Sequence, residues 1–72
     1  MNKALLMGIM RMHNDTQKDL ADALGLSLSR LNAKINEKYG AQFNQTEIAS
    51  IKCRYKLDDT QLNSIFFASI VS

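Results

Sequence analysis

Residues 16–36, TQKDLADALGLSLSRLNAKIN, constrain the fold more than any other stretch, because they predict two short helices joined by a tight turn. Thr16 can N-cap the first helix, and Asp19, three positions later, closes a capping box. Gly25 is a natural end for that helix, because glycine enters the left-handed region without a Cβ penalty. Ser27 can cap the second helix. The turn between them is then about three residues long, as in a helix-turn-helix.

The second helix of this pair has an apolar side and a polar, partly basic side. Leu28, Leu31 and Ile35 recur at helical spacing on one face. A helix with such a polar outer face fits the major groove of B-DNA, where base edges display a distinguishable hydrogen-bonding pattern. The side chains on the outer face and its flanks are Ser29, Arg30, Asn32, Ala33, Lys34 and Asn36.

Five residues of the motif stand where a known family usually has the same residues or equivalents: Gln17, Ala21, Gly25, Leu31 and Asn36. The run DLADALGLSLSRLNAKIN thereby resembles the helix-turn-helix of the phage repressor and Cro family. The C-terminal TEIASI and YKLDDTQLNSIFF runs are similar to small regulators from Gram-positive bacteria and their phages. Lys34 departs from the pattern, because many family members have an inward apolar residue there, a role that Ile35 can take over.

The resemblance implies an all-α, compact five-helix, lambda repressor-like DNA-binding domain that covers residues 1–72 as a single domain. The expected function is sequence-specific transcription regulation, as a phage or prophage Cro-like or repressor-like protein. A homodimer would bind a pseudo-palindromic double-stranded DNA operator, with half-sites about one helical turn (~34 Å) apart. No cofactor, metal, membrane or small-molecule ligand is expected, and the chain leaves no room for a separate sensing domain.

Two other function classes compete with this interpretation. A protein-interaction module of the same fold, such as an antirepressor, would use the second helix or the C-terminal helix against another protein, and the apolar Leu28 and Ala33 favour it. A small enzyme or toxin is disfavoured, because the sequence has no nucleophile motif, acid–base pair or zinc-ligand spacing. His13 is a lone histidine, and Asp58 with Asp59 is explained as a helix cap.

The resemblance places Gln17 against a DNA phosphate, helped by the helix N-terminus. Arg30 can pair with guanine, Asn32 with adenine, and Ala33 can touch a thymine methyl. Ser29 can contact a base or a phosphate, and Leu28 a base or the core; a solvated helix face is the alternative for the whole group. The predicted DNA-binding set is Gln17, Ser27, Leu28, Ser29, Arg30, Asn32, Ala33, Lys34, Asn36 and Lys38, of which Lys34, Asn36 and Lys38 are expected phosphate contacts.

Three further helices are expected outside the motif, and no β-hairpin signal is present. The first covers residues 3–13, and a loop covers residues 37–43. Asn44 can cap the fourth helix and Asp58 the fifth, which is expected over about residues 59–71.

The fifth helix is apolar around most of its circumference, and a helix of that kind is normally buried. Leu62 and Phe66 can face the core. In a chain this small, the remaining apolar sides favour a symmetric dimer interface; the alternative is that the tail folds back over its own core. The predicted interface residues are Ile65, Phe67, Ile70 and Val71.

The composition constrains function and location less than the motif does. The net charge is +2, which is compatible with nucleic acid but not diagnostic of it. The single cysteine excludes a disulfide within the chain, and we expect a reducing, cytoplasmic location. The apolar run near the N-terminus is expected to be an amphipathic helix and not a signal peptide. The run IFFASIV is far below the ~20 residues needed to cross a bilayer.

Overall fold

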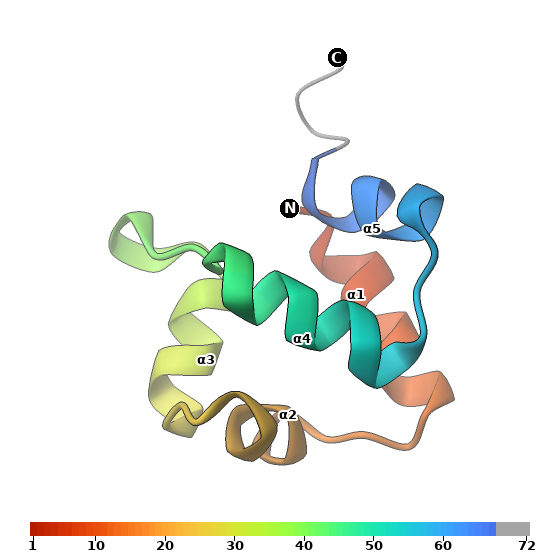
Figure 1. Cartoon of the computed structure of the whole chain (residues 1–72). Helices are drawn as coiled ribbons and strands as arrows, with labels where there is room; N and C mark the ends of the chain where they lie inside the picture. The colour runs from red at the N-terminus through yellow and green to blue at the C-terminus, as the bar shows by residue number, and fades with distance from the viewer. Residues whose placement is uncertain (68–72) are drawn as a thin grey trace.

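Helices account for most of the computed structural model, which describes residues 1–67 (Figure 1). No strand occurs within that range, so the all-α prediction is confirmed. The elements are α1 (Lys3–Met12), α2 (Gln17–Leu24), α3 (Leu28–Ile35), the 3₁₀ helix η1 (Lys38–Gly40), α4 (Gln45–Tyr55) and α5 (Asp59–Phe66).

Local capping sets where most of these helices begin. The side chains of Thr16, Asn44 and Asp58 each accept the N–H three residues later in a reciprocal capping box. The Ser27 side chain caps α3, and Gly25 ends α2 with φ of 70°. The predicted caps of these two helices, and the end of α2 at Gly25, are therefore confirmed.

The core is formed by apolar side chains from all five α-helices. In Figure 1, α4 crosses the middle of the molecule, α2 and α3 lie along one edge, and α5 lies at the opposite end beside the start of α1. The outer surface of α3 therefore points away from α5. The largest fully buried side chains are Leu6, Leu20, Leu31, Ile35, Ile51 and Ile65.

Two predictions about the last helix are wrong. The helix ends at Phe66, because Phe67 has φ of −125° and leaves the helical conformation. Ile65 is fully buried in the core of its own chain, so it has no surface to offer a dimer interface. Phe67 remains exposed. The other two predicted interface residues, Ile70 and Val71, lie outside the described residues.

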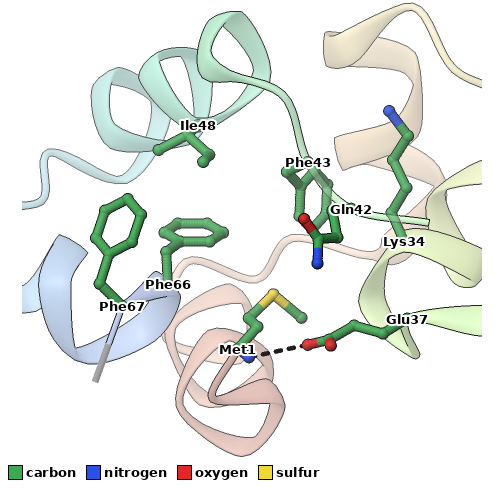
Figure 2. Close-up of a pocket in the computed structure, with 8 residues that line it drawn as sticks. All are labelled: Met1, Lys34, Glu37, Gln42, Phe43, Ile48, Phe66 and Phe67. Atoms are coloured by element: carbon green, nitrogen blue, oxygen red, sulfur yellow. Dashed lines mark hydrogen bonds and ion pairs between the residues drawn. The ribbon is translucent and has the colours of Figure 1, made fainter. Parts of the chain in front are cut away.

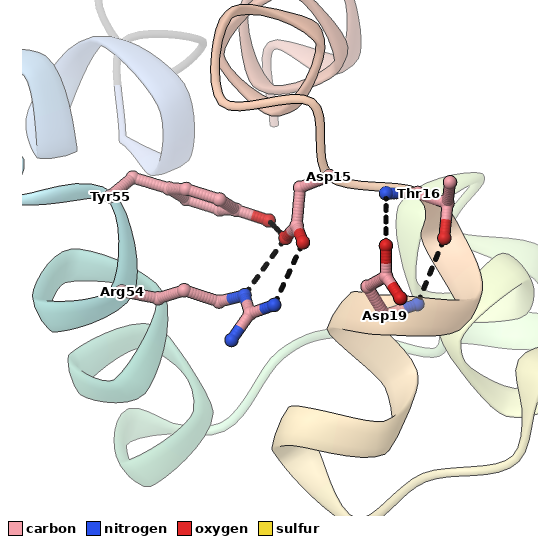
Figure 3. Close-up of polar contacts among 5 residues, drawn as sticks. All are labelled: Asp15, Thr16, Asp19, Arg54 and Tyr55. Carbon is pink, nitrogen blue, oxygen red and sulfur yellow. Dashed lines mark hydrogen bonds and ion pairs between the residues drawn. The ribbon is translucent and has the colours of Figure 1, made fainter.

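A polar brace joins the link before α2 to the end of α4 (Figure 3). The Asp15 carboxylate accepts two hydrogen bonds from Arg54, at 2.7 and 2.8 Å, and one from the Tyr55 hydroxyl. The hydrogen bond from Arg54 is the main reason that the pKa of Asp15 is lowered. Burial, together with the neighbouring carboxylate, raises the pKa of Tyr55. The brace fixes the residue directly before the Thr16 cap.

The Asp15→Asn variant should lose stability at neutral pH but not in acid. Because the folded-state pKa of Asp15 is depressed, its stabilising effect is present above the unfolded pKa and is lost as pH falls through the folded pKa. We expect a loss of about 2 kcal/mol at neutral pH, because the Asp15 side chain is 10% exposed but Arg54 is 35% exposed. The difference should shrink below about pH 4. Urea unfolding across this pH range measures it.

The matched control is Asp22→Asn, which removes a carboxylate from an exposed pair with Lys18. It should change stability little at either pH. If Asp15→Asn lost the same free energy in acid as at neutral pH, the ionised brace would be contradicted.

Candidate nucleic-acid interface

The outer side of α3 and the η1 turn share one surface. A shallow hollow of about 620 Å³ lies between them. Five of its six lining residues belong to the predicted DNA-binding set, and the sixth was not predicted from the sequence. The lining residues are Leu28, Ser29, Asn32, Ala33, Lys38 and Tyr39.

The first turn of α3 projects outward. Leu28 is 48% exposed, which decides between the two roles that the sequence left open: it is not a core residue. Ser29 and Arg30 are also exposed, whereas Leu31 and Ile35 are buried on the opposite side of the helix. Leu31 and Ile35 therefore form the inner face that the sequence pattern predicted, whereas Leu28, which the pattern grouped with them, is exposed.

Two exposed cations, one in the first turn of α3 and one in η1, are available to an anionic partner. Arg30 and Lys38 are exposed. Within residues 1–67, neither side chain forms an ion pair or hydrogen bond. A guanidinium that forms no ion pair or hydrogen bond within the protein can bind a phosphate. Through two parallel N–H groups it can also bind the edge of guanine.

Lys34 has a different partner from the one predicted. Its ammonium lies 2.6 and 2.8 Å from the two carboxylate oxygens of Glu47, and the side chains are 12% and 9% exposed. Burial raises the pKa of Glu47. The hydrogen bonds from Lys34 and from the Asn44 N–H lower this pKa by more than burial raises it, so the net shift is downward. Lys34 ties α3 to α4 through this pair, and its contact with phosphate stays a prediction.

On this face, Asn32 forms hydrogen bonds with two other residues of the predicted set, Gln17 and Asn36. The Asn32 amide nitrogen donates to Gln17 Oε1 at 3.0 Å. The Asn36 amide nitrogen donates to Asn32 Oδ1 at 2.8 Å and to the Asn32 carbonyl at 2.9 Å. These two bonds use both hydrogens of the Asn36 amide, so it has no donor left for a phosphate.

The Ser27 hydroxyl is exposed at the start of α3, where its oxygen accepts the Arg30 N–H at 3.1 Å. Its hydrogen is still free to donate, so Ser27 stays in the predicted DNA-binding set.

Tyr39 is the surface residue that sequence reasoning missed. It is fully exposed and has φ of 56°, and its neighbours Glu37 and Gly40 also have positive φ, at 53° and 75°. A left-handed backbone costs a non-glycine residue of order 1 kcal/mol or more. An aromatic residue next to a glycine in a short polar loop was the available signal.

A second hollow, of about 340 Å³, lies on the side of the molecule nearer α5 (Figure 2). Three aromatic rings border it: Phe66 meets Phe43 edge to face, with centroids 5.9 Å apart, and Phe67 lies next to Phe66. Phe67 is 38% exposed. Across the hollow, the Met1 nitrogen donates to Glu37 at 2.8 Å. Phe67 is thus the predicted interface residue whose exposure the structure shows.

Residues 1–67 contain no cluster of three or more histidine, cysteine or acidic side chains that could hold a metal ion. None of the helices described here has the length and apolar character needed to cross a bilayer.

Comparison with models of protein families, with curated proteins and with solved structures finds no match for this chain. Membership of the repressor and Cro family therefore stays a prediction from the resemblance of its motif.

Proposed function

We propose that this protein is a sequence-specific DNA-binding transcriptional regulator that inserts the outer face of α3 into the major groove. The observation that carries the proposal is the exposed first turn of α3, which includes the cation Arg30, beside a hollow that the exposed cation Lys38 also lines. A single α-helix fits the major groove, which is about 12 Å wide. The caps at both ends of the turn fix where α2 ends and α3 begins, and buried side chains of both helices, among them Ala21 and Leu31, belong to one core.

Direct contacts with bases would come from α3. Arg30 can bind guanine, Asn32 adenine, and Ala33 a thymine methyl. Lys38, Ser27 and the start of α2 lie at the edges of this face and would contact phosphates, which position the protein without reading sequence.

Selection from a random duplex library tests the proposal. The protein should enrich a pseudo-palindromic sequence, and the logarithm of its binding constant should fall linearly with the logarithm of salt concentration. No enrichment, together with no duplex binding at low salt, would contradict the proposal.

A second candidate function is supported by the same surface. Leu28 and Tyr39 are both exposed and border one hollow, an arrangement that also suits an apolar protein partner. This candidate keeps the fold but predicts that the selection enriches no sequence.

We further propose that the protein acts as a homodimer through Phe67 and the hollow beside it. The Phe67→Asp variant should elute as a monomer in size-exclusion chromatography, because a charge on that surface would have to be buried at the interface. The matched control is Met12→Asp, which places the same charge at an apolar residue that is 82% exposed at the end of α1. It should leave elution unchanged. If Phe67→Asp also eluted at the dimer position, Phe67 would not be part of the interface.

A further inference from the structure

A line of side-chain hydrogen bonds crosses from α1 through α3 to α2 and returns to α1. The Lys3 ammonium donates to Asn36 Oδ1. Asn36 donates to Asn32 Oδ1 at 2.8 Å, and Asn32 donates to Gln17 Oε1 at 3.0 Å. The Gln17 amide nitrogen in turn lies 3.8 Å from the Met7 sulfur. Asn32, in the middle of the line, also borders the hollow between α3 and η1.

The two ends of the line give it one direction. An amide group can present either its oxygen or its nitrogen to a neighbour, so three amides in a row have two opposite arrangements. Lysine can only donate and the Asn32 backbone carbonyl can only accept, so Asn36 turns its oxygen to Lys3 and its nitrogen to Asn32. Asn32 must then accept from Asn36 and donate to Gln17. Met7, at the far end, offers only a weak acceptor, which agrees with the same direction.

This direction determines what the Asn32 amide can offer to a ligand. One amide hydrogen and one lone pair of Oδ1 remain after its bonds to Gln17 and Asn36. Adenine presents an acceptor, N7, beside a donor, N6, in the major groove, whereas guanine presents two acceptors. An amide already held in one orientation presents its donor and acceptor to the adenine pair without further ordering, whereas an amide free to flip must first be ordered on binding.

From these contacts, and resting on the proposed function, we infer that Lys3 is a positioning residue for base selection. Its ammonium, together with the Asn32 carbonyl that accepts from the Asn36 amide, sets the direction of the amide line and so favours the orientation of Asn32 that pairs with adenine. Lys3 lies 33 positions before Asn36 in the sequence and outside the helix-turn-helix.

The test measures binding to the selected operator and to operators changed at single base pairs. The Asn32→Ala variant first identifies the base pair whose discrimination depends on Asn32. At that pair the wild-type protein should discriminate by about tenfold or more. The Lys3→Met variant should reduce this discrimination to within about threefold, while discrimination at the other base pairs stays. The Lys3→Arg variant retains a donor-only head and should restore it.

Lys18→Met is the matched control, because Lys18 is an exposed lysine on α2 outside the amide line. It should leave discrimination unchanged at every base pair. In the free protein, the side-chain amide NMR signals of Asn32 and Asn36 should shift in Lys3→Met but not in Lys18→Met.

Three outcomes would overturn the inference. Lys3→Met could lower the affinity equally for all operators. It would then also reduce, by about one, the slope of the logarithm of the binding constant against the logarithm of salt concentration, as loss of a phosphate contact does. It could leave discrimination at the Asn32-dependent pair unchanged, or Asn32→Ala could affect no base pair. In each of these cases the wild-type protein still selects an operator and the proposed function stands. If the wild-type protein selected no duplex, that result would contradict both the proposed function and this inference.

Discussion

Replacing Glu47 with alanine is expected to lower the free energy of unfolding by about 3 kcal/mol. Glu47 is 7% exposed, and it both binds the Lys34 ammonium and accepts the Asn44 N–H in the capping box of α4. Alanine leaves the Lys34 ammonium, on a side chain 12% exposed, without a counter-charge. In a small domain this is a large share of the total stability. Urea denaturation followed by circular dichroism measures the loss.

Two further variants separate charge pairing from capping. Glu47→Gln keeps an acceptor at the third helical position and should lose less than alanine. Adding Lys34→Met to Glu47→Gln should recover stability, because it removes the unpaired buried charge. The control is Lys52→Ala, which breaks an exposed ion pair with Asp59, a side chain that is 86% exposed. It should change the free energy of unfolding little. A Glu47→Ala loss no larger than that of Lys52→Ala would contradict the role given to the buried pair.

Replacing Arg30 with alanine should weaken specific operator binding by about 1–3 kcal/mol and relax the preference at one base pair. The fold should stay intact, because the Arg30 side chain is exposed and forms no ion pair or hydrogen bond within residues 1–67. Fluorescence anisotropy with a labelled operator measures the affinity, and circular dichroism checks the helix content.

Lys18→Ala is the control for this variant, because it removes an exposed positive charge from α2 instead of α3. It should not change base preference. Unchanged affinity of Arg30→Ala for the cognate operator would remove Arg30 from the base-contacting set.

The helix boundaries of the motif could be predicted because their causes are local. The bonds of the Thr16 capping box span three residues, and Gly25 needs only its own backbone freedom. The outward face of α3 followed from the same short-range periodicity. These features do not depend on where the rest of the chain lies.

The features that the sequence did not predict have longer-range causes. Lys34 pairs with Glu47, which lies 13 positions away on another helix. Ile65 was assigned to an interface because its helix is apolar on several sides, but the packing of α5 against the start of α1 buries it. The position of Lys3 beside Asn36 likewise depends on how α1 packs, which no pattern within either helix specifies.

The central claim is that the outer face of α3 contacts a DNA duplex, and amide NMR during titration with the selected operator tests it most directly. The account predicts that the largest shift changes fall on residues 28–33 and 38–40, with small changes at Phe43 and Phe66. Changes centred on the hollow around Phe43 and Phe66, with none on residues 28–33, would contradict the account.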